Sequence, residues 1–254
     1  MKKFFKLTSA ILIITSVFFV MPKEVMAAVT FRSTSTNNGS GTTLVVAEPA
    51  GAAENDILIA IMVGGAGATH GLPSGWTQLY SGTLTSVFNG LAGYIRRGVS
   101  APDLTFTSSP SSFMEVRIVA YSGVIATGDP IDAASAIGTF HNDTNPIDPP
   151  SVTAVGSATM AIAGGASWNG GTATAPTGYT LRSPSPNAFR FAEKQLSASG
   201  AENPGAFGGS PDQSWNGFTI TLVPAASGAV DIGRTLRLFA GFHIKIFNGK
   251  LKIY

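Results

Sequence analysis

Short apolar runs separated by turns rich in glycine and proline recur along most of the chain. The clearest runs are residues 57–63, 114–121, 159–163 and 217–223. Each is too short for a typical helix and is bounded by turn-forming residues, which predicts buried β-strands. No stretch shows a convincing amphipathic helical pattern. The hydrophobic pattern therefore predicts an all-β fold.

The same order of apolar runs and turns occurs twice along the chain. The first copy carries Gly64-Gly65 and then Pro73-Ser74-Gly75-Trp76-Thr77. The second carries Gly164-Gly165 and then Pro176-Thr177-Gly178-Tyr179-Thr180, offset by 100 residues at the glycines and 103 at the prolines. The repeat predicts a jelly-roll-like antiparallel β-sandwich built from two internally similar halves. The halves are residues 28–124 and 151–224, and a proline-rich crossover loop, 125–150, joins them.

The C-terminal segment, residues 225–254, has a different pattern. Asn248-Gly249 separates two alternating stretches, and this dipeptide suits the positive φ angles of a two-residue hairpin turn. The sequence therefore predicts a β-hairpin in which Ile246 faces Leu251 and Lys245 faces Lys252. An isolated hairpin is marginally stable in water, so its apolar side requires a cover.

Residues 1–27 have the pattern of a secretory signal peptide. Basic residues at positions 2, 3 and 6 precede an apolar stretch over 7–21, and Val25-Met26-Ala27 supplies a cleavage site. An uncleaved membrane anchor is the alternative, but the apolar stretch is short for a bilayer span. We expect cleavage after Ala27 and a mature chain that is secreted, extracellular or held at a cell surface, with no transmembrane segment.

Composition supports a folded domain with a sizeable core. Apolar residues make up 44% of the chain and charged residues only 12%, with 30 glycines and 15 prolines. That balance does not fit a disordered chain. The absence of cysteine excludes disulfides, cysteine zinc sites and thiol nucleophiles.

Charge is distributed unevenly once the signal peptide is removed. The body, residues 28–224, has seven basic and twelve acidic residues, a net charge of −5. The tail beyond it is basic, with a net charge of +4 from five cations and Asp231. The five cations are Arg234, Arg237, Lys245, Lys250 and Lys252. We expect the tail to dock on an acidic face of its own body, on another copy of the chain or on an anionic surface polysaccharide. The acidic body argues against nucleic acid as a partner.

Several motifs in order resemble a known module. They are residues 56–60 (Asp-Ile-Leu-Ile-Ala), Tyr121-Ser122-Gly123-Val124, Pro130-Ile131-Asp132 and the two Pro-x-Gly-aromatic turns. Together they resemble a duplicated β-sandwich module of phage tail and other virion proteins and of secreted or surface-attached bacterial proteins. The resemblance covers residues 29–224 and implies a structural or adhesive role without catalytic residues. The signal peptide departs from virion proteins and favours a bacterial secreted protein.

Aromatic residues next to asparagine are the candidate ligand contacts. Trp168 and Asn169 lie in a glycine-rich loop, where an indole could stack on the face of a sugar. Trp215 is a weaker candidate, since it begins an expected core strand. Packing over the sandwich is the alternative for these tryptophans, and core packing is expected for Trp76 and Tyr179.

Four aspartates gather in and near the crossover loop: Asp129, Asp132, Asp143 and Asp148. Calcium prefers several oxygen ligands, so this loop is the candidate metal site, and no other cofactor is expected. The alternative is ordinary turn chemistry, in which aspartate caps the backbone beside proline.

Catalytic motifs are absent from the sequence. There is no His-Glu-x-x-His pattern and no Gly-x-Ser-x-Gly elbow. A glycosidase pair of carboxylates, such as Glu115 with Glu193, is not selected by any spacing. The sequence predicts an exported, non-catalytic structural or adhesive module, in one version carbohydrate-binding. The alternatives are a carbohydrate-active enzyme on a sandwich scaffold and a phage virion or tail structural protein.

Overall fold

The computed structural model describes residues 26–83, 88–140, 146–167, 172–183, 188–209 and 214–226, and strand segments at 236–237, 243–247 and 250–253. Across these ranges the chain is all-β. None of the described residues forms a helix with the length and hydrophobicity needed to cross a membrane. Two compact units are present: residues 27–225, and a unit made of the segments before and after them.

The first half of the larger unit forms one six-stranded antiparallel sheet, called sheet one. Its strands are β1 (Thr30–Val45), β2 (Ile57–Gly65), β3 (Thr69–Gly71), β4 (Thr77–Thr83), β5 (Phe88–Arg96) and β6 (Thr105–Ser122). Their spatial order is β1-β6-β2-β5-β4, and β3 also pairs with β6. β6 is long enough to pair with β2 through residues 114–121 and with β3 through residues 107–109.

The second half forms another six-stranded antiparallel sheet, called sheet two. Its strands are β7 (Ile131–Ala134), β8 (Gly138–Phe140), β10 (Met160–Ser167), β12 (Thr180–Leu181), β13 (Phe189–Gln195) and β16 (Trp215–Leu222). The spatial order is β12-β13-β10-β16-β7, and β8 also pairs with β16. Two short ribbons flank it: β9 (Val152–Ala154) with β14 (Gly200–Glu202), and β11 (Ala173–Thr174) with β15 (Gly208–Gly209).

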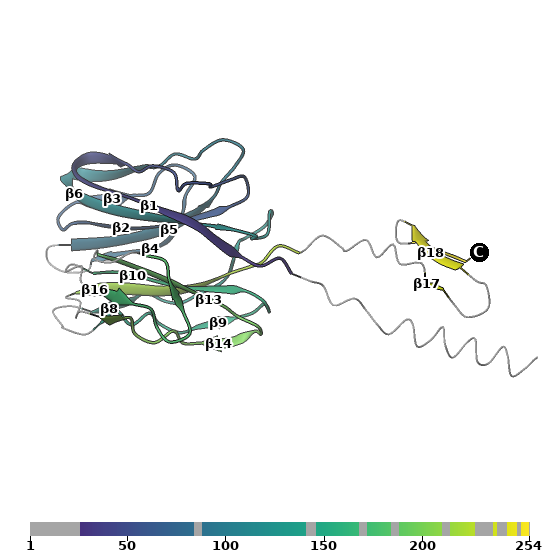
Figure 1. Ribbon diagram of the computed structural model, residues 1–254. Helices are drawn as coiled ribbons and strands as arrows, with labels where there is room; N and C mark the ends of the chain where they lie inside the picture. Colours follow the sequence, from purple (N-terminus) through teal and green to yellow (C-terminus); the bar gives the residue numbers. More distant parts are fainter. Residues whose placement is uncertain are drawn as a thin grey trace, which may run out of the picture. The chain divides into compact units, whose positions relative to one another are not determined.

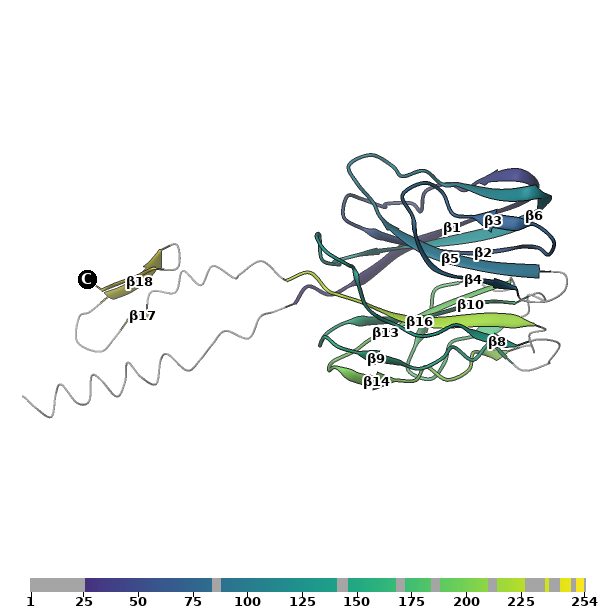
Figure 2. The same ribbon diagram turned by 180° about the vertical axis from the view of Figure 1, so that it is seen from behind.

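The two sheets lie face to face as the layers of a sandwich (Figure 1), and the view from behind shows the same two layers (Figure 2). One apolar cluster between them draws on both sheets. Along β2 the side chains alternate, so Ile57, Ile59 and Ile61 belong to this central core. Sheet two contributes Phe189, Phe191, Phe218, Ile220 and Leu222, among others. The all-β sandwich expected from the sequence is confirmed.

Each sheet also has a buried outer face. Leu58, Ala60 and Met62 of β2 pack against residues from β1 and the outer part of β6, such as Leu44 and Phe106. On sheet two, a third cluster gathers Ala161, Ala163, Tyr179, Phe207 and Trp215, among others. Burial on both faces explains why residues 57–63 form a continuous apolar run instead of an alternating one.

The two Pro-x-Gly-aromatic segments form the same turn. The N–H of Trp76 donates to the carbonyl of Pro73, and that of Tyr179 donates to the carbonyl of Pro176. Gly75 and Gly178 both have φ of +82°, which the third position of a type II turn requires. Each turn leads into the edge strand of its sheet, β4 in sheet one and β12 in sheet two. The strand order β1-β6-β2-β5-β4 of sheet one corresponds, strand by strand, to the order β7-β16-β10-β13-β12 of sheet two. Internal duplication of the sequence remains a prediction.

The crossover, 125–150, contains strands β7 and β8, which pair with β16 at the edge of sheet two. The sequence also predicts turns at Asn38-Gly39 and Asn89-Gly90, and both predictions are wrong. Asn38-Gly39 lies within β1, where Asn38 pairs with Glu115. The register shifts of this pairing lie elsewhere, between Phe31 and Ser33 and between Gly41 and Thr43. Asn89-Gly90 lies within β5, with Asn89 opposite Gly64. Pairing with long neighbours overrides the local turn preference in both dipeptides.

The C-terminal unit contains a three-stranded sheet of β17 (Leu236–Arg237), β18 (His243–Phe247) and β19 (Lys250–Ile253). Its register pairs Ile246 with Leu251 and Lys245 with Lys252. The predicted hairpin register is therefore confirmed.

Candidate functional site

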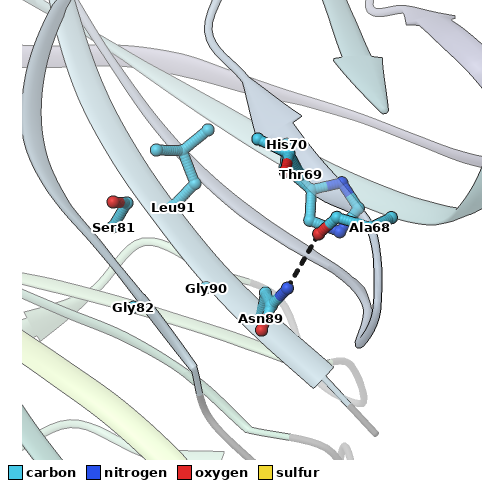
Figure 3. A pocket seen from close by; sticks show the side chains of 8 residues that line it. All are labelled: Ala68, Thr69, His70, Ser81, Gly82, Asn89, Gly90 and Leu91. Carbon is cyan, nitrogen blue, oxygen red and sulfur yellow. Dashed lines mark hydrogen bonds between the residues drawn. The ribbon is translucent and has the colours of Figure 1, made fainter. Parts of the chain in front are cut away.

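A cavity of about 220 Å³ opens on sheet one where β3 stands beside β4 and β5 (Figure 3). We call it the His70 pocket. It is lined by Ala68, Thr69, His70, Ser81, Gly82, Asn89, Gly90 and Leu91. Leu91 belongs to the outer cluster of sheet one, so the pocket lies on the face turned away from sheet two.

Strand pairing brings the lining residues together. On β4 and β5, Ser81 pairs with Leu91, and Gly82 pairs with Gly90. β3 is held above them by its pairing with β6, in which His70 lies opposite Ser108. The side-chain amide of Asn89 donates a hydrogen bond of 2.9 Å to the carbonyl of Ala68 and so ties the loop before β3 to β5 (Figure 3).

The imidazole of His70 is fixed by the two consecutive glycines. Its Nε2 lies 3.1 Å from the carbonyl oxygen of Gly65, so Nε2 carries the proton and donates. A Cβ at Gly64 would overlap the imidazole ring, which means that the ring occupies the space a side chain there would fill. Gly64 is therefore required for the position of His70.

The pocket presents neutral polar groups beside an apolar side chain. Of its lining residues only His70 is titratable, and the others offer two hydroxyls, one amide and the side chain of Leu91. Hydroxyl and amide groups both donate and accept hydrogen bonds, which matches a ligand with many hydroxyls. The volume is below the range typical of drug-sized ligands and suits a single small ring.

The predicted aromatic contacts are placed only in part. Trp168 and Asn169 lie outside the described residues. Trp215 is 5% exposed and packs in the outer cluster of sheet two, where its backbone pairs with Ser167. Its burial favours the core role, and a ligand contact for Trp215 remains a prediction. Trp76 and Tyr179 pack against the outer clusters of their respective sheets, as expected.

Two of the four candidate metal-binding aspartates hold the backbone together. Asp132 accepts hydrogen bonds from the N–H groups of Val155 and Gly156 and from the hydroxyl of Thr221. Asp129 accepts from the hydroxyl of Tyr94 and from the N–H of Ile131.

The other two aspartates add no ligand set. Asp148 is exposed, and Asp143 lies outside the described residues. Within the described ranges, no three acidic or histidine side chains gather as a metal site would need. A calcium site remains a prediction, and the geometry of Asp129 and Asp132 fits the turn chemistry named as its alternative.

The basic tail is described only by its backbone. Arg237 pairs with His243, Lys245 with Lys252, and Phe247 with Lys250. Arg234 lies outside the described residues. Docking of the tail on a partner remains a prediction.

The carboxylates considered for glycoside hydrolysis are far apart along the fold. Glu193 accepts a hydrogen bond from Arg182 and lies near the hydroxyl of Tyr121. The pKa of Tyr121 is raised well above its ordinary value, mainly by burial and in smaller part by the negative charge of Glu193. Glu115 lies six residues before Tyr121 on β6, a span of about 20 Å along a strand. Glycosidases hold their two carboxyl groups roughly 5–9.5 Å apart, and no contact in the described part of the chain brings Glu115 and Glu193 together.

Sequence reasoning missed the His70 pocket. The available signal was the Gly64-Gly65 pair followed by His70, which we interpreted as repeat and loop residues. The dipeptide Asn89-Gly90 is typical of a turn, but Asn89 lies in β5 with its side chain at the pocket.

Comparisons with family models, curated proteins and solved structures found no match for this chain.

Proposed function

We propose that the protein is an exported, non-catalytic β-sandwich that binds a neutral carbohydrate through the His70 pocket. The observation that carries this proposal is the pocket itself, with hydroxyl, amide and imidazole groups around the side chain of Leu91. The sugar residue would belong to a surface polysaccharide, and the protein would act as an adhesive or surface-structural module.

The chemistry of the lining supports a neutral sugar over a charged ligand. No lysine, arginine, aspartate or glutamate lines the pocket. Thr69, Ser81 and Asn89 can exchange hydrogen bonds with sugar hydroxyls, while Leu91 offers an apolar surface to the C–H groups of the ring. The pocket is also open to solvent, which suits a residue that remains attached to a polymer.

A binding role is favoured over hydrolysis by the state of the carboxylates. Glu48, Asp56, Glu193 and Glu202 each form an ion pair with an arginine or lysine within the sandwich. A general acid needs a carboxyl group beside the bound sugar, and none of these lines the His70 pocket.

A glycan array with the mature chain tests the proposal. We expect binding to one family of neutral glycans, followed by measurement of the affinity by calorimetry. Ser81→Phe fills the pocket and should reduce the affinity by at least tenfold. Ser100→Phe is the matched control, because Ser100 is exposed and does not line the pocket.

Two results would overturn the proposal. One is a glycan that binds Ser81→Phe and wild type with equal affinity, when Ser81→Phe and Ser100→Phe both have the Tm of the wild type. The other is release of new reducing ends from the bound glycan, which would favour the carbohydrate-active enzyme. A mature chain that binds no glycan but assembles into large particles would favour the virion or tail structural protein.

A further inference from the structure

Arg117 differs from the three arginines of the sandwich that form ion pairs. Its side chain is buried, with 4% of the residue exposed, and its Nε and Nη1 atoms have no hydrogen-bond partner among the described residues. By contrast, Arg32, Arg97 and Arg182 each form an ion pair with a carboxylate. Buried polar groups in folded proteins almost always have a partner, and a buried charge without one is costly. The burial also lowers the pKa of the Arg117 guanidinium.

Arg117 lies on the face of sheet one that turns toward sheet two. It occupies β6 two residues before Val119, which belongs to the central core, and strand residues two apart share a face. The His70 pocket lies on the opposite face of the same sheet. The two sites are therefore separate.

The edge of the sheet beside Arg117 is open to solvent. β1 is the edge strand next to β6, and Arg117 pairs with Thr36 of β1. Directly paired residues share a face, and Thr36 and Asn38 are both exposed. The Nε and Nη1 atoms are themselves covered, so an ion that binds them would have to enter from the β1 edge by displacing the exposed side chains there.

The charges around Arg117 favour an anion. Arg190, which is 1% exposed, is close enough for its positive charge to lower the pKa of Arg117 further. Glu115 lies on the same face of β6 and acts in the opposite direction. Its carboxylate forms no ion pair with Arg117 in the described part of the chain, and burial raises the pKa of Glu115. The positive charges of Arg117 and Arg190 together exceed the single negative charge of the partly buried Glu115.

We propose that Arg117 is the centre of an oxyanion site between the sheets at the β1 edge. A guanidinium presents its N–H groups in a planar fork that matches the two oxygens of a carboxylate, sulfate or phosphate group. Such a group would supply the hydrogen bonds that Nε and Nη1 lack. The site is independent of the neutral-sugar pocket, so either proposal can fail without the other.

Titration of the full mature chain with sodium sulfate, sodium phosphate and sodium glucuronate tests this site. Sodium chloride keeps the ionic strength constant, and thermal unfolding and calorimetry are the two readouts. We expect a saturable rise in Tm of several degrees, because an ion that binds only the folded state stabilises it by mass action. The three salts distinguish a free inorganic anion from the carboxylate of an acidic sugar.

Three variants make the test specific. Arg117→Met should abolish both the saturable Tm rise and the binding heat, leaving the general salt effect that sulfate exerts on any protein. Arg96→Met is the matched control and should respond as wild type, since Arg96 donates to the carbonyl of Gly128 instead. Glu115→Gln should bind the anion several-fold more tightly, because a competing negative charge is removed.

The proposal is overturned if wild type shows no saturable response to any of the three anions. It is also overturned if Arg117→Met retains the response, or if Glu115→Gln abolishes it. Should Arg117→Met fail to fold, the Glu115→Gln and wild-type titrations still decide between these outcomes.

Discussion

The hydroxyl of Tyr80 donates a hydrogen bond of 3.0 Å to Oδ1 of Asn216 across the interface between the two sheets. Tyr80 lies on the edge strand β4 of sheet one, and Asn216 lies on β16 of sheet two. The same oxygen accepts the backbone N–H of Ala166 at 3.2 Å, and Asn216 is fully buried. The side chain of Asn216 thus links the two sheets through a buried hydrogen bond.

Replacement of Tyr80 by phenylalanine removes this link without changing the shape of the core. We expect the free energy of unfolding to fall by about 1–2 kcal/mol, because Asn216 loses one buried partner and keeps the other. Urea unfolding measures the change. Tyr94→Phe is the control, since the hydroxyl of Tyr94 bonds to Asp129 at the surface, and its effect should stay within about 0.5 kcal/mol. Equal losses in both variants would contradict a special role for the Tyr80 contact.

Gly64 and His70 form a second pair whose dependence can be measured. Gly64→Ala places a methyl group in the space of the imidazole, and we expect a loss of about 1–3 kcal/mol from overpacking. Gly82→Ala is the control, because a Cβ there meets no atom within 4 Å. In a double-mutant cycle, Gly64→Ala should cost far less in a His70→Ala background. An undiminished cost in that background would show that the ring is not what excludes the methyl group.

Two buried tyrosines predict a loss of stability at high pH. Burial raises the pKa of both Tyr80 and Tyr121 well above the ordinary value. Above about pH 10 the unfolded chain releases these protons while the folded chain keeps them, so the folded state binds more protons and stability falls as pH rises. Each tyrosine should contribute a slope of about 1.4 kcal/mol per pH unit.

Urea unfolding between pH 8 and pH 11 measures this slope. Tyr80→Phe should reduce the slope of stability against pH by the contribution of one tyrosine. The same variant should also be less stable than wild type at pH 8. A tyrosinate absorbance that appears in the folded protein near pH 10 for all tyrosines would refute the burial effect.

The hydrophobic pattern was sufficient to predict the fold class and the tail register. Burial of residues 57–63 on both faces produces a run that is recognisable without a structure. Asn248-Gly249 fixed the pairing of Lys245 with Lys252 because the turn closes over two residues. Local chemistry failed at Asn38 and Asn89, where pairing with distant strands decides the conformation.

The candidate sites were harder to predict because they depend on contacts between distant segments. The position of His70 depends on the absence of a side chain at Gly64, and the lining of its pocket combines three strands. Arg117 looks like any strand arginine in the sequence. That its Nε and Nη1 atoms lack hydrogen-bond partners can be seen only when the partners of the neighbouring carboxylates are known.

The sandwich should fold without the basic tail, which would separate the role of the tail from that of the body. Ala225 still belongs to the sandwich unit, since its N–H donates a hydrogen bond of 2.7 Å to the carbonyl of Gly123. A mature chain that ends at Ala225 should therefore melt within a few degrees of the full mature chain.

The five cations beyond that point give the tail its net charge of +4. We expect the full mature chain to co-sediment with a polyanionic polysaccharide at low salt and to be released at about 0.5 M salt, where screening is strong. The chain ending at Ala225 should remain in the supernatant at both salt concentrations. A full-length variant with the five cations changed to glutamine controls for tail length and should behave like the shortened chain. If this variant still co-sediments, the apolar side of the hairpin, and not its charge, holds the protein to the polymer.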